Sequence, residues 1–414
     1  MSGFNNISLL DGPNFSGRSH YLKSITGFDN DNAQGIYLGS NPTDFLTGLA
    51  NSVKFELELH GWNGANHSSL SNILKELGFD RKLSQNPFTL SGGEQAALVI
   101  ICASLLSHSK IGIDLLFEQF HDRWKTLLLD YLSRKTQLEI TIADNRTKEY
   151  SDLPKIINYG SMAELEQIDS RLDFGKMKCV SNGKFHKKKG LDLALSDLSF
   201  AYSRANKIFE NISIHLKAGN LYHLIGENGA GKSTLSKILT GVLRPSGNSK
   251  IRMGGKEIIP FKNPGKHVAY CFQNPDEQLF SKTVKQELWP KYMPSENEIE
   301  RIVTWFGLES ILDENPNDLP WVIRKRISIA ATLCLERHWY ILDEPTVGLD
   351  EHSVITLSLI IQTLLDEGKS FIIISHSSTF FDKFENSKEI LLLNGKLKTN
   401  ETNKSTSSPL AKCE

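Results

Sequence analysis

The segment GENGAGKST, residues 226–234, constrains the fold of this chain more than any other. It follows the apolar run Leu221–Ile225, which predicts a buried strand, and it leads into a segment that predicts a helix from about Lys232. Glycines at such a turn allow consecutive backbone N–H groups to curl around phosphate oxygens, and the helix N-terminus adds partial positive charge. We therefore expect a strand, a phosphate-binding loop and a helix within an α/β fold.

The residues of this loop have distinct expected roles. Lys232 supplies a cation to the β- and γ-phosphate oxygens, and the hydroxyl of Ser233 is a ligand suited to Mg²⁺. The loop therefore predicts a nucleoside triphosphate bound with Mg²⁺, and the family resemblance given below implies that this nucleotide is ATP. The loop residues expected to contact ATP are Gly226, Asn228, Gly229, Gly231, Lys232, Ser233 and Thr234.

Two further segments carry residues that this chemistry requires. The apolar run Trp339–Leu342 predicts a strand that delivers Asp343 to the edge of the sheet, where a carboxylate can hold Mg²⁺. Glu344 beside it is expected to orient or deprotonate the attacking water, although paired acids after a strand are also common as helix N-caps. SFIIISHSS places His376 after another apolar strand, where an imidazole can reach the γ-phosphate; alone, a histidine is more often structural.

The same order of signals occurs twice along the chain, which indicates an internal repeat. Each copy has an apolar strand, a glycine loop, an Asn-Pro element, a helix start and an apolar strand followed by an acid. From the Asn-Pro element to the helix start is 51 residues in the first copy and 47 in the second, and from there to the acid is 27 and 24. From the loop to the Asn-Pro element is 22 against 41, so we expect the first copy to lack about a pair of strands. The marker residues are Arg18, Ser40, Ser91 and Glu118 in the first copy and Lys232, Gln273, Pro320 and Glu344 in the second.

Composition limits the class of protein. The 414 residues are enough for two or three domains, and 39% hydrophobic with 23% charged residues is ordinary for a globular protein. A formal net charge of −1 argues against a general polyanion binder, so no nucleic-acid partner is expected. Five scattered cysteines without a CxxC pair favour neither a disulfide framework nor a zinc site. The longest apolar run, residues 96–106, is shorter than the roughly 20 residues that span a bilayer, and we expect the protein on the cytoplasmic side.

The segments GENGAGKST, CFQNPDEQ, LDEPTVGLD and IISHSS, in this order and at these intervals, resemble the nucleotide-binding domain of the ATP-binding cassette (ABC) family. The resemblance covers roughly residues 193–395 and implies an enzyme that hydrolyses ATP. It implies that Gln273 contacts Mg²⁺ and the attacking water and that Tyr202 stacks on adenine, although a single tyrosine after a strand is as often a packing residue. It places Asp350 at a dimer interface. The expected fold class is α/β, with two P-loop cassettes of ABC type, each a mixed sheet with a helical subdomain, the first truncated and degenerate.

The separation of two matching motifs follows from the same resemblance. Sites of this family are shared between two domains arranged head to tail, so the signature LSGGE of the first half is expected to close over the phosphates held by the second half. The two halves would then form an internal pseudo-dimer within one chain. The signature residues expected at the ATP are Ser91, Gly92, Gly93 and Glu94.

The reciprocal site is expected to be degenerate. Arg18 stands where the loop requires lysine, and its planar guanidinium is not equivalent to a lysine enclosed by the loop. Ser40 replaces the glutamine, LLFEQF aligns Phe117 with the metal aspartate and leaves Glu118 alone, and Asn145 aligns with the switch histidine. The second signature reads LPWVIRKR, in which Pro320 lacks an N–H and Trp321 and Val322 block the approach that glycine permits. The degenerate site binds ATP without turnover or binds nothing, and the missing leading strands favour weak or absent binding.

Domain boundaries follow composition and the repeat. We expect a degenerate domain over residues 1–165, a linker over 166–192 with a short lysine cluster, the competent domain over 193–396, and a disordered polar tail over 397–414.

The partner is indicated by VAYCFQNPDEQLFSKTVKQELW, residues 268–289, which resembles the ATPases of energy-coupling-factor importers of vitamins or metal ions. Around Gln273 this segment offers Asp276, Glu277, Leu279 and Phe280 as a surface suited to a partner helix, or alternatively as an ordinary subdomain surface. The expectation is an ATPase peripheral to the cytoplasmic face of the membrane, bound to integral membrane subunits. The alternative is a soluble twin-cassette ABC ATPase acting on the ribosome or nucleic acid, which would usually keep both loops and both signatures intact.

Overall fold

The computed structural model describes residues 4, 6–11, 18–28, 34–63, 68–145, 150, 153, 156–158, 190–203, 206–226, 229–289, 295–375, 378–384, 387–393 and 395–401. The chain divides into two compact units, the first comprising residues 1–172 with 347–351 and the second residues 173–346 with 352–414. Within the described ranges, no helix is both long and apolar enough to cross a membrane.

The second unit is built on a six-stranded sheet with the order β11-β12-β13-β8-β14-β15. Strands β11 to β14 in this order are parallel, and β15 pairs antiparallel with β14. Strands that are covered on both faces are apolar throughout, which explains the continuous hydrophobic runs read from the sequence. The bounds are Val268–Cys271 for β11, Trp339–Asp343 for β12, Ser370–Ile374 for β13, Leu221–Ile225 for β8, Ser387–Leu393 for β14 and Lys396–Glu401 for β15.

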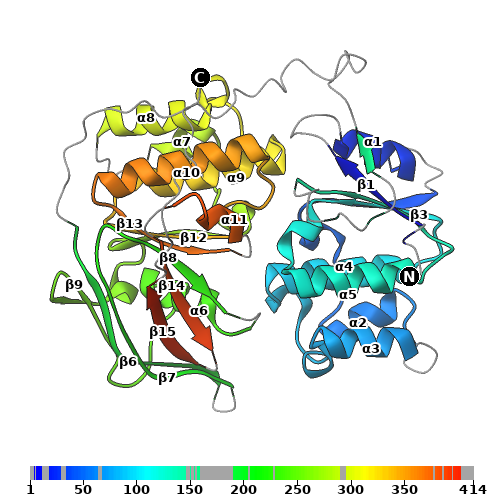
Figure 1. The fold of residues 1–414 in the computed structure, drawn as a ribbon, viewed down its shortest axis with the longest axis horizontal. Coiled ribbons are helices and arrows are strands. Elements are labelled where there is room, and N and C mark those ends of the chain that lie inside the picture. Colours follow the sequence, from blue (N-terminus) through cyan, green and yellow to red (C-terminus); the bar gives the residue numbers. More distant parts are fainter. Residues whose placement is uncertain are drawn as a thin grey trace. The chain divides into compact units, whose positions relative to one another are not determined.

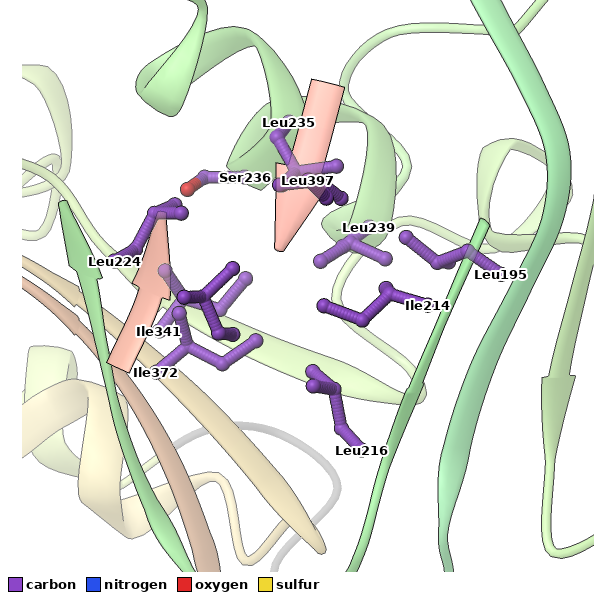
Figure 2. Close-up of a pocket in the computed structure, with 11 residues that line it drawn as sticks. Leu195, Ile214, Leu216, Leu224, Leu235, Ser236, Leu239, Ile341, Ile372 and Leu397 are labelled. Atoms are coloured by element: carbon purple, nitrogen blue, oxygen red, sulfur yellow. The ribbon is translucent and has the colours of Figure 1, made fainter. Parts of the chain in front are cut away.

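One face of this sheet carries helix α6 and a four-stranded antiparallel sheet with the order β10-β9-β6-β7 (Figure 1). Apolar side chains from both sheets and from α6 surround a small cavity (Figure 2), among them Leu195, Leu224 and Leu235. This layer holds α6, and therefore the loop that precedes it, against strand β8. The bounds are Lys232–Thr240 for α6, Leu193–Ser203 for β6, Asn206–Leu216 for β7, Lys250–Met253 for β9 and Lys256–Ile258 for β10.

The other face carries helices α9 and α10, with α7 and α8 beyond them (Figure 1). Helix α9 contacts strands β11 and β12 directly, so it lies behind the ends of the two strands that carry Gln273 and Asp343. The bounds are Val284–Leu288 for α7, Glu296–Phe306 for α8, Trp321–Cys334 for α9, Glu351–Asp366 for α10 and Ser378–Phe381 for α11.

The first unit contains a five-stranded parallel sheet with the order β2-β3-β4-β1-β5. Helix α1 packs on one face through Leu22, and the other face forms a larger core with α2 to α5. The strands are β1 Ile7–Asp11, β2 Gly35–Leu38, β3 Lys110–Asp114, β4 Glu139–Ala143 and β5 Ile156–Asn158. The helices are α1 Arg18–Thr26, α2 Val53–Leu59, α3 Ser68–Glu76, α4 Gly92–Leu105 and α5 Asp122–Ser133.

The order of the first sheet corresponds strand by strand to β11-β12-β13-β8-β14 of the second. Helices α4 and α9 both have 14 residues, and each follows a short Asn-Pro 3₁₀ turn, at Pro87–Thr89 and Pro316–Asp318. Among the described residues, the first unit has no counterpart of the antiparallel sheet, in agreement with the missing strands predicted from the 22-residue interval. Its described sheet is wholly parallel, so the prediction of a mixed sheet holds for the second unit and is wrong for the described part of the first.

Two predicted boundaries are corrected by the structure. The predicted tail begins at residue 397, but β15 pairs with β14 as far as Glu401 because Leu397 packs on the apolar layer. Of the predicted linker, residues 166–189 lie outside the described residues, whereas Asp192 binds the second unit: its side chain accepts from the N–H of Ala218 at 2.9 Å. Residues 402–414 also lie outside the described residues.

Candidate functional site

The phosphate-loop motif of the second unit lies between β8 and α6, as the sequence predicts. The amine of Lys232 donates to the Gly226 carbonyl at 2.7 Å, so its charge lies beside the loop backbone. Gly231 has a φ of +101°, and a Cβ atom there would lie 2.7 Å from Ile208 Cγ2. Gly226 likewise faces the Leu392 carbonyl, 2.6 Å from where its Cβ would be. These glycines are therefore required by the backbone conformation and by the close packing of the loop.

A hydroxyl and a carboxylate meet where α6 begins and β12 ends. Ser233 Oγ lies 3.2 Å from Asp343 Oδ2, and the Tyr270 hydroxyl donates to the same carboxylate oxygen at 2.8 Å. Burial raises the pKa of Asp343, while the hydrogen bond from Tyr270 and the nearby Lys325 and Lys232 oppose that shift. Hydroxyl and carboxylate oxygens are the donors that Mg²⁺ prefers, so these two residues fit the ion that the loop chemistry requires.

Glu344 follows Asp343 in a left-handed backbone conformation. Its φ is +45°, its side chain is 4% exposed, and its N–H donates to the Ile374 carbonyl at 2.8 Å. A non-glycine residue in this conformation is uncommon and is maintained only where the surrounding structure enforces it. The bond to β13 enforces it here, and it fixes the carboxylate immediately after the metal-binding position.

The segment after β11 places Gln273 next to this site. Asn274 caps the following 3₁₀ turn by accepting from the N–H of Asp276 at 3.1 Å. Gln278 ties the segment to helix α9, since its amide donates to the Ser328 carbonyl and to Thr332 Oγ1, each at 2.9 Å. The loop that carries Gln273 is thus held from both ends.

Tyr202 lies beside the start of α6. Its hydroxyl is 3.2 Å from Thr234 Oγ1, its ring meets Phe200 edge-on, and it remains 57% exposed. An exposed ring that is anchored at its hydroxyl next to a phosphate loop is suited to stacking on a base. Two further predicted residues, Asn228 and His376, lie outside the described residues.

Two residues of the site were not identified from the sequence. Tyr270 binds Asp343 from 73 positions away, and nothing in VAYC distinguishes it from a core tyrosine. Lys325 has no exposed surface and donates to the Gln273 carbonyl at 2.7 Å. Its neighbours Arg324 and Arg326 make the segment RKR read as an ordinary charged helix start, so no signal in the sequence singled out Lys325.

In the first unit the signature begins a helix. Ser91 is the exposed N-cap residue of α4, followed by Gly92 and Gly93. Glu94 was predicted to contact ATP, but its carboxylate is 5% exposed, accepts from the Ser91 N–H at 3.0 Å and pairs with Lys82. In this structure Glu94 positions the helix start, and its contact with ATP stays a prediction.

The acid of the first unit lies at a different residue from the one predicted. β3 ends at Asp114, which accepts from the Tyr37 hydroxyl at 2.8 Å, as Asp343 accepts from Tyr270. Leu115 then has a φ of +60° and donates its N–H to the Ala143 carbonyl at 2.9 Å, as Glu344 donates to Ile374.

The alignment of Phe117 with the metal aspartate and of Glu118 with the general base is therefore wrong by three residues. Leu115 follows Ser91 by 24 residues, as Glu344 follows Pro320, so the corrected spacing matches. Glu118 instead accepts from the backbone N–H of Asn145 at 2.9 Å. The first unit therefore retains an aspartate, Asp114, at the metal position where Phe117 was predicted, and has Leu115 at the position of the general base.

Arg18, the residue in place of the loop lysine, is 5% exposed and turned toward the segment after β4. Its guanidinium donates to the Asp144 carbonyl at 3.1 Å and to Asn145 Oδ1. Asn145 follows β4 at the position that His376 has after β13, as the sequence alignment predicts. Residues 12–17 of this loop lie outside the described residues.

The predicted partner surface around Gln273 is smaller than the sequence suggests. Leu279 is 4% exposed and belongs to the core, so its inclusion in that surface is wrong, whereas Phe280 is 80% exposed. The first unit has an exposed leucine in the corresponding connection, Leu49, at 77%. Leu49 lies between the 3₁₀ turn Pro42–Phe45 and α2, and Phe280 lies between the 3₁₀ turn Pro275–Glu277 and α7. Each unit thus exposes a large apolar side chain at the corresponding place in its chain.

The chain is similar in sequence to ATP-binding proteins of ABC transporters. The model of the ABC transporter family matches residues 209–347. A protein of Clostridium tetani named as an ABC transporter ATP-binding protein is 32% identical over 269 residues, which is 62% of this chain and 61% of that protein. One of Pyrococcus furiosus with the same kind of name is 34% identical over 206 residues, 48% of this chain and 78% of its own length.

One further relative matches most of the chain, and one solved structure matches about half of it. An ABC transporter ATP-binding protein of Methanosarcina mazei is 25% identical over 353 residues, covering 80% of this chain and 71% of that protein. The solved structure of cbiO1 from Clostridium perfringens is 27% identical with a TM-score of 0.43, over 51% of this chain and 89% of that one.

Proposed function

Since the chain belongs to the ABC transporter family of ATP-binding proteins, which hydrolyse ATP, we propose that it is the ATPase subunit of a transporter whose membrane-spanning parts are separate chains. The observation that carries the proposal is the cluster at the carboxyl ends of β8 and β12. There Lys232, Ser233, Asp343 and Glu344 lie together within one unit, with the hydroxyl and the carboxylate 3.2 Å apart.

The roles of these residues follow from their chemistry. ATP bound with Mg²⁺ supplies the anhydride bond that is cleaved. Lys232 offsets the charge of the phosphate oxygens, and Ser233, Asp343 and Gln273 hold the metal. Glu344 accepts the proton of the attacking water because its backbone fixes the carboxylate next to Asp343. His376 completes the proposed set by donating to the γ-phosphate.

We place the second half of the hydrolytic site in the first unit. Its helix α4 begins with the exposed Ser91 followed by two glycines, whereas α9 of the second unit begins with Pro320 and Trp321. The hydroxyl of an exposed serine and the N–H groups of the glycines after it can bind an anion at a helix start, whereas proline has neither a hydroxyl nor a backbone N–H group. The Methanosarcina match over 80% of this chain supports a repeat that extends into the first half, and hence an internal pseudo-dimer.

The reciprocal site is proposed to be inactive. Leu115 provides no base, and Asn145 replaces the switch histidine. The guanidinium of Arg18 donates hydrogen bonds to Asp144 and Asn145 within the first unit. Because these bonds direct it toward the segment after β4, they favour weak or absent nucleotide binding there. One ATP is therefore turned over per chain in each cycle.

We propose an importer of the energy-coupling-factor kind. The energy-coupling factor transporter ATP-binding protein EcfA1 of Thermotoga maritima is 28% identical over 202 residues, 76% of its length. The exposed Phe280 beside the acidic Glu277, and the exposed Leu49 in the first unit, are suited to helices of membrane subunits that carry apolar and basic residues. The protein would then be peripheral, at the cytoplasmic face of the membrane.

Copurification from native membranes tests this proposal. The full chain is tagged and solubilised in mild detergent, and its partners are identified by mass spectrometry. Integral membrane subunits recovered with wild type and lost in Phe280→Ser are the expected result. Recovery of ribosomal proteins or nucleic acid without membrane subunits would overturn the transporter proposal and favour a soluble twin-cassette ATPase.

A further inference from the structure

Lys325, the fifth residue of helix α9, is a lysine with no exposed surface. Its amine donates to three backbone carbonyls: Phe272 at 3.1 Å, Gln273 at 2.7 Å and Asp343 at 3.3 Å. All three acceptors are at the ends of β11 and β12, which are adjacent parallel strands of the sheet. A single amine thus joins the segment that carries Gln273 to the segment that carries Asp343 and Glu344.

This position is costly for a charged group. Moving an ammonium group out of water is unfavourable unless hydrogen bonds and opposite charges offset the loss of hydration. Burial lowers the pKa of Lys325, and Cys271, Asp343 and Glu344 act in the opposite direction. An apolar side chain would fill the same space without this unfavourable term. The lysine therefore contributes through the backbone carbonyls that its N–H groups bind.

The first unit provides an internal comparison. There the carbonyl of Ser40, the counterpart of Gln273, accepts from the neutral amide of Gln119 at 3.2 Å. The fifth residue after the N-cap of α4 is the buried Ala96, where α9 has Lys325. Both units therefore hold this carbonyl, but the charged amine that also reaches the acid segment occurs in the unit that has the intact acid pair.

We propose that Lys325 is a positioning residue for ATP hydrolysis, which fixes the backbone of Gln273 relative to Asp343 so that their side chains meet the metal and the water in one geometry. It acts through these two residues and does not itself contact the nucleotide. The inference rests on the proposed site in the second unit. It predicts that loss of the amine slows turnover more than it weakens ATP binding.

The test combines two readouts on the full chain. Lys325→Met keeps the length of the side chain and removes its donors. We expect kcat to fall at least 10-fold while the KM for ATP stays within threefold, because the phosphate loop is unchanged. Hydrogen exchange measured without nucleotide should accelerate in peptides covering residues 272–278 and not in those covering β8 and α6.

Two variants keep the test decisive. Lys125→Met removes another buried lysine, 5% exposed, on α5 of the first unit, and it should leave kcat and the exchange of 272–278 unchanged. Lys325→Gln keeps one neutral N–H donor on a shorter side chain, so it should protect residues 272–278 less than wild type but more than the methionine variant does, and kcat should fall more than threefold. It replaces the methionine variant, with the same overturning results, if that one does not fold.

The proposal is overturned if kcat stays within threefold of wild type, or if exchange rises evenly through the whole second unit with a matching loss of ATP binding. The second result would mean that Lys325 only stabilises the core. The exchange readout does not depend on turnover, so a wild-type protein that fails to hydrolyse ATP would contradict the proposed function and not the tie between the two segments.

Discussion

At the scale of single residues, the site of the second unit depends on short links between groups that are distant in sequence. Tyr270 and Ser233 both lie within 3.2 Å of the Asp343 carboxylate, and the N–H of Glu344 is bound to the neighbouring strand β13. Each link fixes an oxygen atom that the reaction requires. Removal of the charge of the Glu344 carboxylate should therefore stop ATP hydrolysis without weakening the binding of ATP.

Glu344→Gln is expected to lower turnover by about 10²–10⁴-fold, the usual contribution of a general base, with ATP still bound. Steady-state phosphate release and equilibrium binding of a fluorescent ATP analogue measure the two quantities. Glu139→Gln is the matched control: this carboxylate is 63% exposed at the start of β4 and lies 4.0 Å from Lys110, so turnover should stay close to wild type. Continued hydrolysis in Glu344→Gln would show that a residue other than Glu344 acts as the general base.

Arg18→Ala is expected to leave turnover nearly unchanged but to loosen the first unit. The guanidinium is buried and holds Asp144 and Asn145, and its loss leaves buried acceptors unsatisfied at a cost of about 1–3 kcal/mol. Faster hydrogen exchange in peptides covering residues 139–145 is the measurement. Arg134→Ala, which removes an exposed pair with Asp130, serves as the control and should change neither property. A large loss of turnover in a folded Arg18→Ala protein would show that the first loop takes part in catalysis.

At the scale of elements, the phosphate loop is held by a packed strand and a packed helix. The sequence predicted both bounds because the signals are local: the apolar run ends at Ile225 and the helix begins at Lys232. Gly231 between them has a left-handed φ and lies against β7, where Ile208 and Phe209 leave no room for a side chain.

Gly231→Ala is expected to lower the stability of the second unit and the affinity for ATP. The left-handed φ costs an alanine about 1–2 kcal/mol, and the clash with Ile208 adds about 1–3 kcal/mol. Gly247→Ala is the matched control, since that glycine has a φ of +66° with nothing within 4 Å of the added Cβ. Calorimetric unfolding and ATP titration compare the two variants; equal losses in both would show that the packing of the loop on β7 is unimportant.

The first-copy acid could not be assigned from the sequence. The segment IDLLFEQF contains two acids, Asp114 and Glu118, within one apolar run, and hydrophobicity alone does not show where the strand ends. Pairing with β4 ends the strand at Asp114, and this pairing depends on residues about thirty positions away. Lys325 and Tyr270 were missed for the same reason, because their roles arise from contacts between elements and not from local pattern.

At the scale of the whole molecule, two units with the same strand order carry different functional segments. The second unit carries the intact loop and acid pair, and the first carries the intact signature at an exposed helix start. The sequence predicted this division because both motifs are contiguous. The joining of the two parts in one site remains a prediction, and it is the central claim.

The most direct test of that claim is the ATPase rate of Ser91→Arg compared with Pro320→Arg. The two variants place the same side chain at the N-cap of corresponding helices, α4 and α9. We predict that Ser91→Arg lowers turnover about 100-fold or more, as expected for loss of an anion-binding element at the reacting phosphate, while Pro320→Arg stays within a few-fold of wild type. A wild-type rate in Ser91→Arg, or an equal loss in both variants, would contradict a single hydrolytic site shared between the two units.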